Sequence, residues 1–119
     1  MNLTSLAGQV QTQNPFVLSV SVVESDGRVR ASLDDDKTWI ARATALLVPL
    51  RELLDRTGAE LGCGVPTSTL IQGDDATMAL ADVDGTATVV VMGRTDAPGG
   101  ALLSDARWLA EQIRGGAAT

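Results

Sequence analysis

The chain has 119 residues, 45% hydrophobic and 20% charged, which is the composition of an ordinary globular protein. This length supports one hydrophobic core, so we expect a single domain over residues 1–119. A formal net charge of −6 and a pI near 4.4 disfavour nucleic acid and anionic membranes as partners. The sequence contains no His, the commonest general base and metal ligand. We therefore expect a non-enzymatic protein with no catalytic, cofactor-binding or metal-binding residues.

The sequence also bears on where the protein works. No apolar run approaches the roughly 20 residues that span a bilayer. Residues 1–10 lack the basic and apolar regions of a signal peptide. The single Cys63 cannot form an internal disulfide, which fits a reducing compartment. We expect a cytoplasmic protein that does not insert into membranes.

The first predicted elements are a helix and a hairpin. Residues 2–13 form the helix, with apolar residues at helical spacing: Leu3, Leu6, Ala7 and Val10. Residues 17–23 alternate Leu18, Val20 and Val22 with serines, which predicts a strand with one buried face. Asp26-Gly27 is a tight-turn signal, and a second strand follows on the alternating residues Val29, Ala31 and Leu33.

The longest periodic segment, residues 38–62, predicts an amphipathic helix of about six turns. Its apolar positions step by three and four residues: Trp39, Ile40, Ala43, Leu46, Leu47, Leu50, Leu53, Leu54 and Leu61. Three carboxylates (residues 34–36) precede it as N-terminal caps, and Gly62 ends it. Pro49 lies mid-helix. Because the leucines keep their phase across Pro49, one kinked helix is favoured over two helices with a break near Val48.

Three strands and a closing helix are predicted after this segment. The strands cover residues 65–72, 76–82 and 86–92, and the unbroken run 89–92 indicates a central strand covered on both faces. Residues 101–114 form the last helix, with apolar residues at helical spacing: Leu102, Leu103, Ala106, Leu109, Ala110 and Ile113. Residues 115–119 form a disordered tail. The order α-β-β-α-β-β-β-α predicts an α+β fold, a five-stranded antiparallel sheet with helices on its faces.

Several segments also resemble the roadblock/dynein light chain family, in particular its bacterial members. The segments are the run 20–27 (VSVVESDG), Ala45-Leu46-Leu47, Leu61-Gly62-Cys63-Gly64, residues 70–74, residues 79–84 and Leu102-Leu103. The resemblance covers nearly the whole chain and implies a roadblock/profilin-like fold. It implies a homodimer that binds and regulates, or scaffolds, a small Ras-like GTPase or a related signalling partner.

The same resemblance assigns the dimer or partner interface to the central helix and the strand after it. The residues implied are Trp39, Arg42, Leu47, Leu54, Thr67, Thr69 and Ile71. An alternative with similar architecture is a small-molecule-binding sensor domain, which a monomer with a cavity under the sheet would favour. The identity of the partner and the direction of regulation stay open.

Three features have both a functional and a simpler interpretation. Trp39 suits an interface anchor and a core residue equally well. Cys63 has no His partner and follows a helix C-terminus, so an unreactive thiol is favoured. The acidic residues 34–36 lack the spacing of a calcium loop, so helix capping is favoured over cation binding.

Overall fold

The computed structural model describes residues 2–34 and 36–116. Its elements follow the predicted order: α1 (Leu3–Gln13), β1 (Val17–Glu24), β2 (Val29–Ser32), α2 (Lys37–Glu60), β3 (Ser68–Gln72), β4 (Thr77–Val83), β5 (Ala87–Gly93) and α3 (Gly99–Arg114). The strands form one sheet in the order β2-β1-β5-β4-β3, with every neighbouring pair antiparallel. The predicted fold class is confirmed, and β5 is the central strand. Of the predicted tail, residues 117–119 lie outside the described residues.

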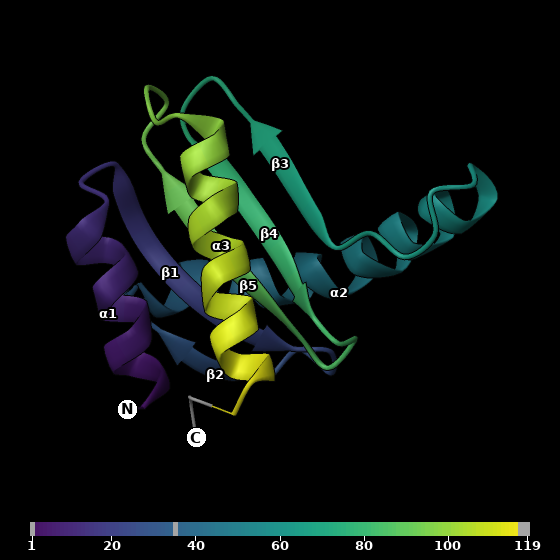
Figure 1. The fold of residues 1–119 in the computed structure, drawn as a ribbon, viewed down its shortest axis with the longest axis horizontal. Helices are drawn as coiled ribbons and strands as arrows, with labels where there is room; N and C mark the ends of the chain where they lie inside the picture. The colour runs from purple at the N-terminus through teal and green to yellow at the C-terminus, as the bar shows by residue number, and fades with distance from the viewer. Residues whose placement is uncertain (1, 35, 117–119) are drawn as a thin grey trace.

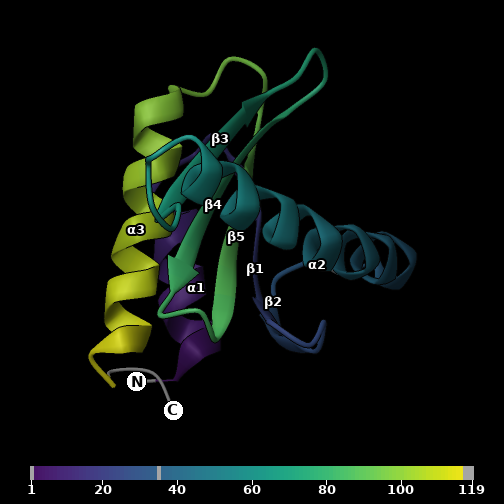
Figure 2. The ribbon, with the colours of Figure 1, turned by 90° about the vertical axis from the view of Figure 1, so that its right-hand side faces the viewer.

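The elements form three layers. Helices α1 and α3 lie on one face of the sheet, and α2 crosses the opposite face (Figure 2). In Figure 1 the last turns of α2 extend past the β3 edge of the sheet. Part of α2 therefore has no strand of its own chain beneath it.

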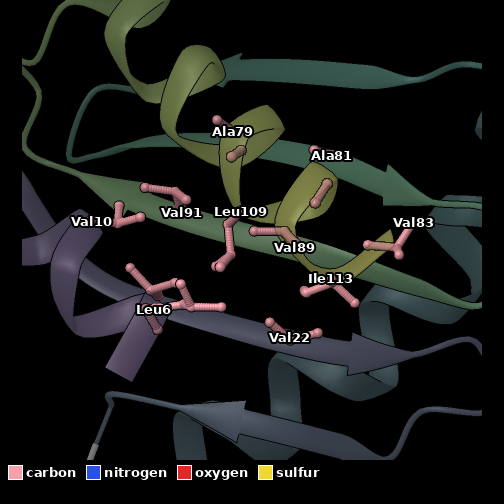
Figure 3. Close-up of a cluster of buried hydrophobic side chains, with 14 of the residues drawn as sticks. Leu6, Val10, Val22, Ala79, Ala81, Val83, Val89, Val91, Leu109 and Ile113 are labelled. Carbon is pink, nitrogen blue, oxygen red and sulfur yellow. The ribbon is translucent and has the colours of Figure 1, made fainter. Parts of the chain in front are cut away.

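The main hydrophobic core lies between the sheet and the pair α1 and α3 (Figure 3). Leu102 and Leu109 of α3 are fully buried against the valines of the central strands. Gly93 at the end of β5 allows this close packing, because a Cβ there would lie 2.7 Å from Leu102 Cδ1. The helical spacing of apolar residues therefore correctly predicted which face of α1 and of α3 is buried.

Strand β1 differs from its predicted burial pattern. Leu18, predicted on the buried face, is 53% exposed, whereas Ser19 and Ser21 are each 5% exposed. The pairing of β1 with β5 shifts register between Val17 and Ser19, and this irregularity puts Leu18 out of phase. Helix α2 covers the second face of the sheet, so the serines are buried, and the Ser21 and Ser32 hydroxyls share a hydrogen bond of 2.9 Å.

Helix α2 is continuous through Pro49, so one helix rather than two is confirmed, and the kink stays a prediction. Asp36 is its N-cap, and Asp36 Oδ1 accepts a hydrogen bond from the Trp39 N–H at 3.0 Å. Asp34 Oδ1 accepts one from the Asp36 N–H at 2.8 Å, while residue 35 lies outside the described residues. Gly62 follows the helix with a φ of +81°, a conformation that suits glycine at a helix end.

Strand β3 begins later than predicted, at Ser68 instead of residue 65. The Cys63 and Gly64 N–H groups donate to the Gly58 carbonyl at 2.8 and 3.1 Å, so the chain first folds back on α2. Val65 is 66% exposed as a result. The other helix and strand ends coincide with the predicted ends or differ from them by one or two residues.

Candidate interaction face

Helix α2 carries more apolar surface than its own sheet covers. Within α2, all of whose residues are described, Leu47 and Gly58 are the buried ones. Leu47 packs with Val23, Leu80 and Val90 in a small second cluster. Leu46 and Leu53, by contrast, are 62% and 56% exposed. These two leucines lie seven residues apart, on the same side of the helix, and form an apolar stripe open to solvent.

An open groove of about 320 Å³ runs between the N-terminal half of α2 and the sheet. It is lined by Trp39, Arg42, Ala43, Leu46, Leu47, Leu50, Met78, Val90 and Met92. Thr69 and Ile71 of β3 pair with Leu80 and Met78 of β4, so they lie on the same face of the sheet. The flexible side chains of Met78 and Met92 and the aromatic ring of Trp39 make this groove suitable for binding an apolar surface of another molecule.

Arg51 fixes α2 to the sheet. Arg51 Nη2 lies 3.1 Å from Asp82 Oδ1 and donates to the Pro66 carbonyl at 3.3 Å, while Arg51 Nε donates to Asp55 Oδ1 at 3.1 Å. The Arg51 and Asp82 side chains are 22% and 14% exposed. Asp82 also accepts a hydrogen bond from the Gly85 N–H at 3.0 Å. One guanidinium thus links the helix, strand β4 and the segment before β3.

Replacing Arg51 tests this link. We expect Arg51→Met to lower the free energy of unfolding by about 2 kcal/mol, because it leaves the mostly buried Asp82 carboxylate without its cation. Urea unfolding monitored by circular dichroism measures the loss. Arg28→Met is the matched control: the Arg28 side chain is 77% exposed and its ion pairs with Glu24 and Asp26 lie at the surface, so stability should change by less than about 1 kcal/mol. Equal losses in the two variants would contradict the role of Arg51.

Comparison with solved protein structures identifies the fold of this chain. No family model and no curated protein matches the sequence. Among solved structures, a roadblock/LC7 domain from Streptomyces avermitilis superposes with a TM-score of 0.86 over 100% of both chains at 18% identity. Myxococcus xanthus MglB gives a TM-score of 0.84 at 10% identity, covering 95% of this chain and 92% of that one. The chain has the roadblock fold. Acanthamoeba castellanii profilin II is a more distant match, with a TM-score of 0.67 and 13% identity over 98% of this chain and 99% of that one. The roadblock/profilin-like fold expected from the sequence is confirmed.

In this roadblock fold, the seven residues implied by the resemblance lie on the α2 side of the sheet. Trp39, Arg42 and Leu47 line the open groove. A small pocket where α2 meets the start of β3 contains Leu47 again with Leu54, Thr67 and Thr69. Ile71, 40% exposed, lies on the same face. Leu47 itself is only 8% exposed, so it is buried beneath this face and contributes little to the accessible surface.

Sequence reasoning did not single out four apolar residues of this face as site residues. They are the exposed Leu46 and Leu53 on α2, and the partly buried Met78 and Met92 in the groove. The helical periodicity of α2 included Leu46 and Leu53, but the apolar stripe is wide, and the periodicity does not show which side of it faces the sheet. Met92 ends the unbroken apolar run 89–92, so no alternation marked the face on which it lies.

Among the described residues, no group of three His, Cys, Asp or Glu side chains is placed to hold a metal ion. None of the helices in this part of the chain combines the length and apolarity needed to cross a bilayer.

Proposed function

We propose that this chain is a non-enzymatic homodimer that binds a small Ras-like GTPase or a related signalling protein, and regulates or scaffolds it. The observation that carries the proposal is the incompletely covered helix α2. Its exposed Leu46 and Leu53 lie beside an open apolar groove. The GTPase class comes from the sequence resemblance to bacterial roadblock proteins, and the roadblock fold supports it.

A second copy of the chain is the expected occupant of this face. A two-fold dimer uses the same patch on both subunits, so a surface that carries both an apolar stripe and an apolar groove can complement itself. The end of α2 that extends past the β3 edge would reach over the partner subunit (Figure 1). Strand β3 lies at the edge of the sheet, with one side free to pair with another strand. Pairing of the two β3 strands would join two sheets into one.

Regulation would follow from a composite face that only the dimer presents. If this face contacts the switch region of the GTPase and binds one nucleotide state more tightly, it shifts the equilibrium toward that state. A scaffold would bind both states equally and leave the nucleotide cycle unchanged. Measuring the affinity for the GDP-bound and GTP-bound partner separates these roles.

The first test is the solution mass. We expect size-exclusion chromatography with light scattering to give a stable dimer of the 12.3 kDa chain across a range of concentrations. A Ras-like GTPase encoded beside this gene would then be assayed for complex formation, nucleotide release and hydrolysis with and without the protein. A monomer at high concentration would contradict the dimer, and a dimer without effect or binding would contradict the GTPase partner.

The open groove also favours one alternative, a sensor domain for an apolar small molecule. A groove of about 320 Å³ with Trp39 in its lining has the size and character of a ligand site. This function predicts a monomer in which an apolar dye changes the fluorescence of Trp39. The variant Trp39→Phe retains Trp108 and is the control that assigns the signal.

A further inference from the structure

The sheet has an edge strand on each side, and β3 is the one that is open to pairing with another strand (Figure 1). Strand β2 has four residues, carries Arg30 and shifts register in its pairing with β1. Strand β3 contains no charged residue and no proline, and its pairing with β4 is regular from Ser68 to Gln72. Charges, short length and bulges are the features by which edge strands avoid association. Strand β3 has neither the charge nor the bulge.

The hydrogen bonds to β4 show which backbone groups of β3 remain at the free edge. The Asp82 N–H donates to the Thr67 carbonyl at 2.9 Å, and beyond the other end of β3 the Gly73 N–H donates to the Ala76 carbonyl at 2.9 Å. Residues of an antiparallel strand alternate in bonding to a given neighbour, so every second residue from Thr67 to Gly73 bonds to this side. The residues between them point their N–H and C=O groups to the free edge: Ser68, Leu70 and Gln72.

The two ends of β3 limit how a second β3 strand can align with it. Pro66 has no N–H to continue the outward-facing row before Ser68. After Gln72 the chain turns at residues 73–75, where it carries two exposed carboxylates. A residue on the two-fold axis of an antiparallel pair lies opposite its own copy. Moving the axis one residue away from Leu70 puts Gln72 opposite Pro66, or Ser68 opposite the turn. An axis at Leu70 alone pairs every outward-facing residue of β3 with another.

We propose that the two β3 strands of the dimer pair antiparallel about an axis at Leu70, so that Leu70 of each subunit lies opposite its own copy. This register rests on the proposed homodimer and extends it, because it fixes which side chains meet. On the α2 face, Thr69 lies opposite Ile71 of the partner subunit, in the closer, non-hydrogen-bonded type of pair that suits β-branched residues. Ile71 is 40% exposed in the single chain, and this pair covers it.

On the other face of the sheet, the register brings a residue of α3 into the interface. Arg107 Nε and Nη2 both donate to Ser68 Oγ, at 3.2 and 2.9 Å, so the guanidinium lies over the start of β3. Ser68 lies opposite Gln72 of the partner subunit in this register. A guanidinium carries more N–H donors than these two, so Arg107 keeps donors for the side-chain carbonyl of that glutamine. Arg107 therefore contacts both subunits.

A cysteine scan of β3 reads the register directly. Cys63→Ser removes the exposed native thiol, and single cysteines then replace the strand residues one at a time: Ser68, Thr69, Leu70, Ile71 and Gln72. With diamide as oxidant, we expect Leu70→Cys to form a disulfide-linked dimer at least ~10-fold faster than the other four, because only its copy lies within the roughly 7 Å between Cα atoms that a disulfide spans. Rates are read from non-reducing gels.

An equimolar mixture of the Thr69→Cys and Ile71→Cys proteins supplies a second reading of the register. These two positions face each other across the dimer, so the mixture should cross-link at least ~10-fold faster than either protein alone. This arm keeps the test decisive if Leu70→Cys fails to fold, since Leu70 packs against the main core. No gain in the mixture would overturn the register.

Light scattering on the reduced Cys63→Ser protein separates this inference from the proposed dimer. A dimer whose fastest cross-link lies at a position other than 70 would overturn the register, as would a dimer that cross-links at none of the five. A monomer would contradict the dimer and the register together. Arg107→Met should raise the dimer Kd at least ~3-fold, with Arg28→Met unchanged as the control. An unchanged Kd for Arg107→Met would exclude the contact from α3.

Discussion

Leu53→Asp is expected to dissociate the proposed dimer while leaving the fold of the subunit unchanged. Leu53 is 56% exposed in the single chain, so its replacement keeps a carboxylate in water in the monomer. In a dimer that covers the α2 stripe, the same carboxylate would be buried without a partner. This costs about 3 kcal/mol or more, which raises the dimer Kd by more than ~100-fold. Light scattering across a dilution series measures the change, and circular dichroism checks the fold.

The choice of position and control follows from the burial of each leucine. Leu47, implied by the resemblance as an interface residue, is a poor choice because it packs in the core, and Leu47→Asp would unfold the chain. Leu18→Asp is the matched control, since Leu18 is 53% exposed and lies on β1 outside the groove. We expect it to remain dimeric. A Leu53→Asp protein with the wild-type Kd would exclude the α2 stripe as the interface.

Leu109→Ala is expected to lower the free energy of unfolding by about 3 kcal/mol. Leu109 is fully buried between α3 and the sheet, where Val89 and Val91 surround it (Figure 3). Removing most of its side chain loses apolar burial and leaves a cavity that a closely packed core fills only in part. Urea unfolding at one fixed protein concentration measures the effect, because dimerisation would make apparent stability depend on concentration.

The same substitution at an exposed leucine separates this packing effect from the loss of helix or strand propensity. Leu18→Ala should cost far less, within about 1 kcal/mol, because Leu18 is already mostly in water. A loss at Leu109 no larger than the loss at Leu18 would contradict the burial that the structure assigns to α3. Both variants keep the α2 face intact, so they should retain the oligomeric state of the wild type.

Local chemistry in the sequence determined most of the elements and their order. The Asp26-Gly27 pair predicted a tight turn, and the positive φ angle of Gly27 agrees with it. The Asp84-Gly85 pair carries the same local signal, and Gly85 also has a positive φ angle. The leucine spacing of α3 predicted the face that is buried. These signals depend on a few neighbouring residues, so they can be read without knowing what packs against them.

Only the tertiary structure decided how the α2 side of the sheet is arranged. The apolar stripe of α2 is wider than one contact surface, and nothing local tells Leu46 from Leu47, although one is 62% and the other 8% exposed. The burial of Ser21 depends on α2, which comes later in the chain and covers it. Residues 65–67 favour strand, yet the hydrogen bonds from the Cys63 and Gly64 N–H groups to the Gly58 carbonyl fold the preceding residues back on the helix, and β3 begins only at Ser68. For the leucines and Ser21 the outcome depends on packing between segments distant in sequence, which outweighs the local preference of the residues.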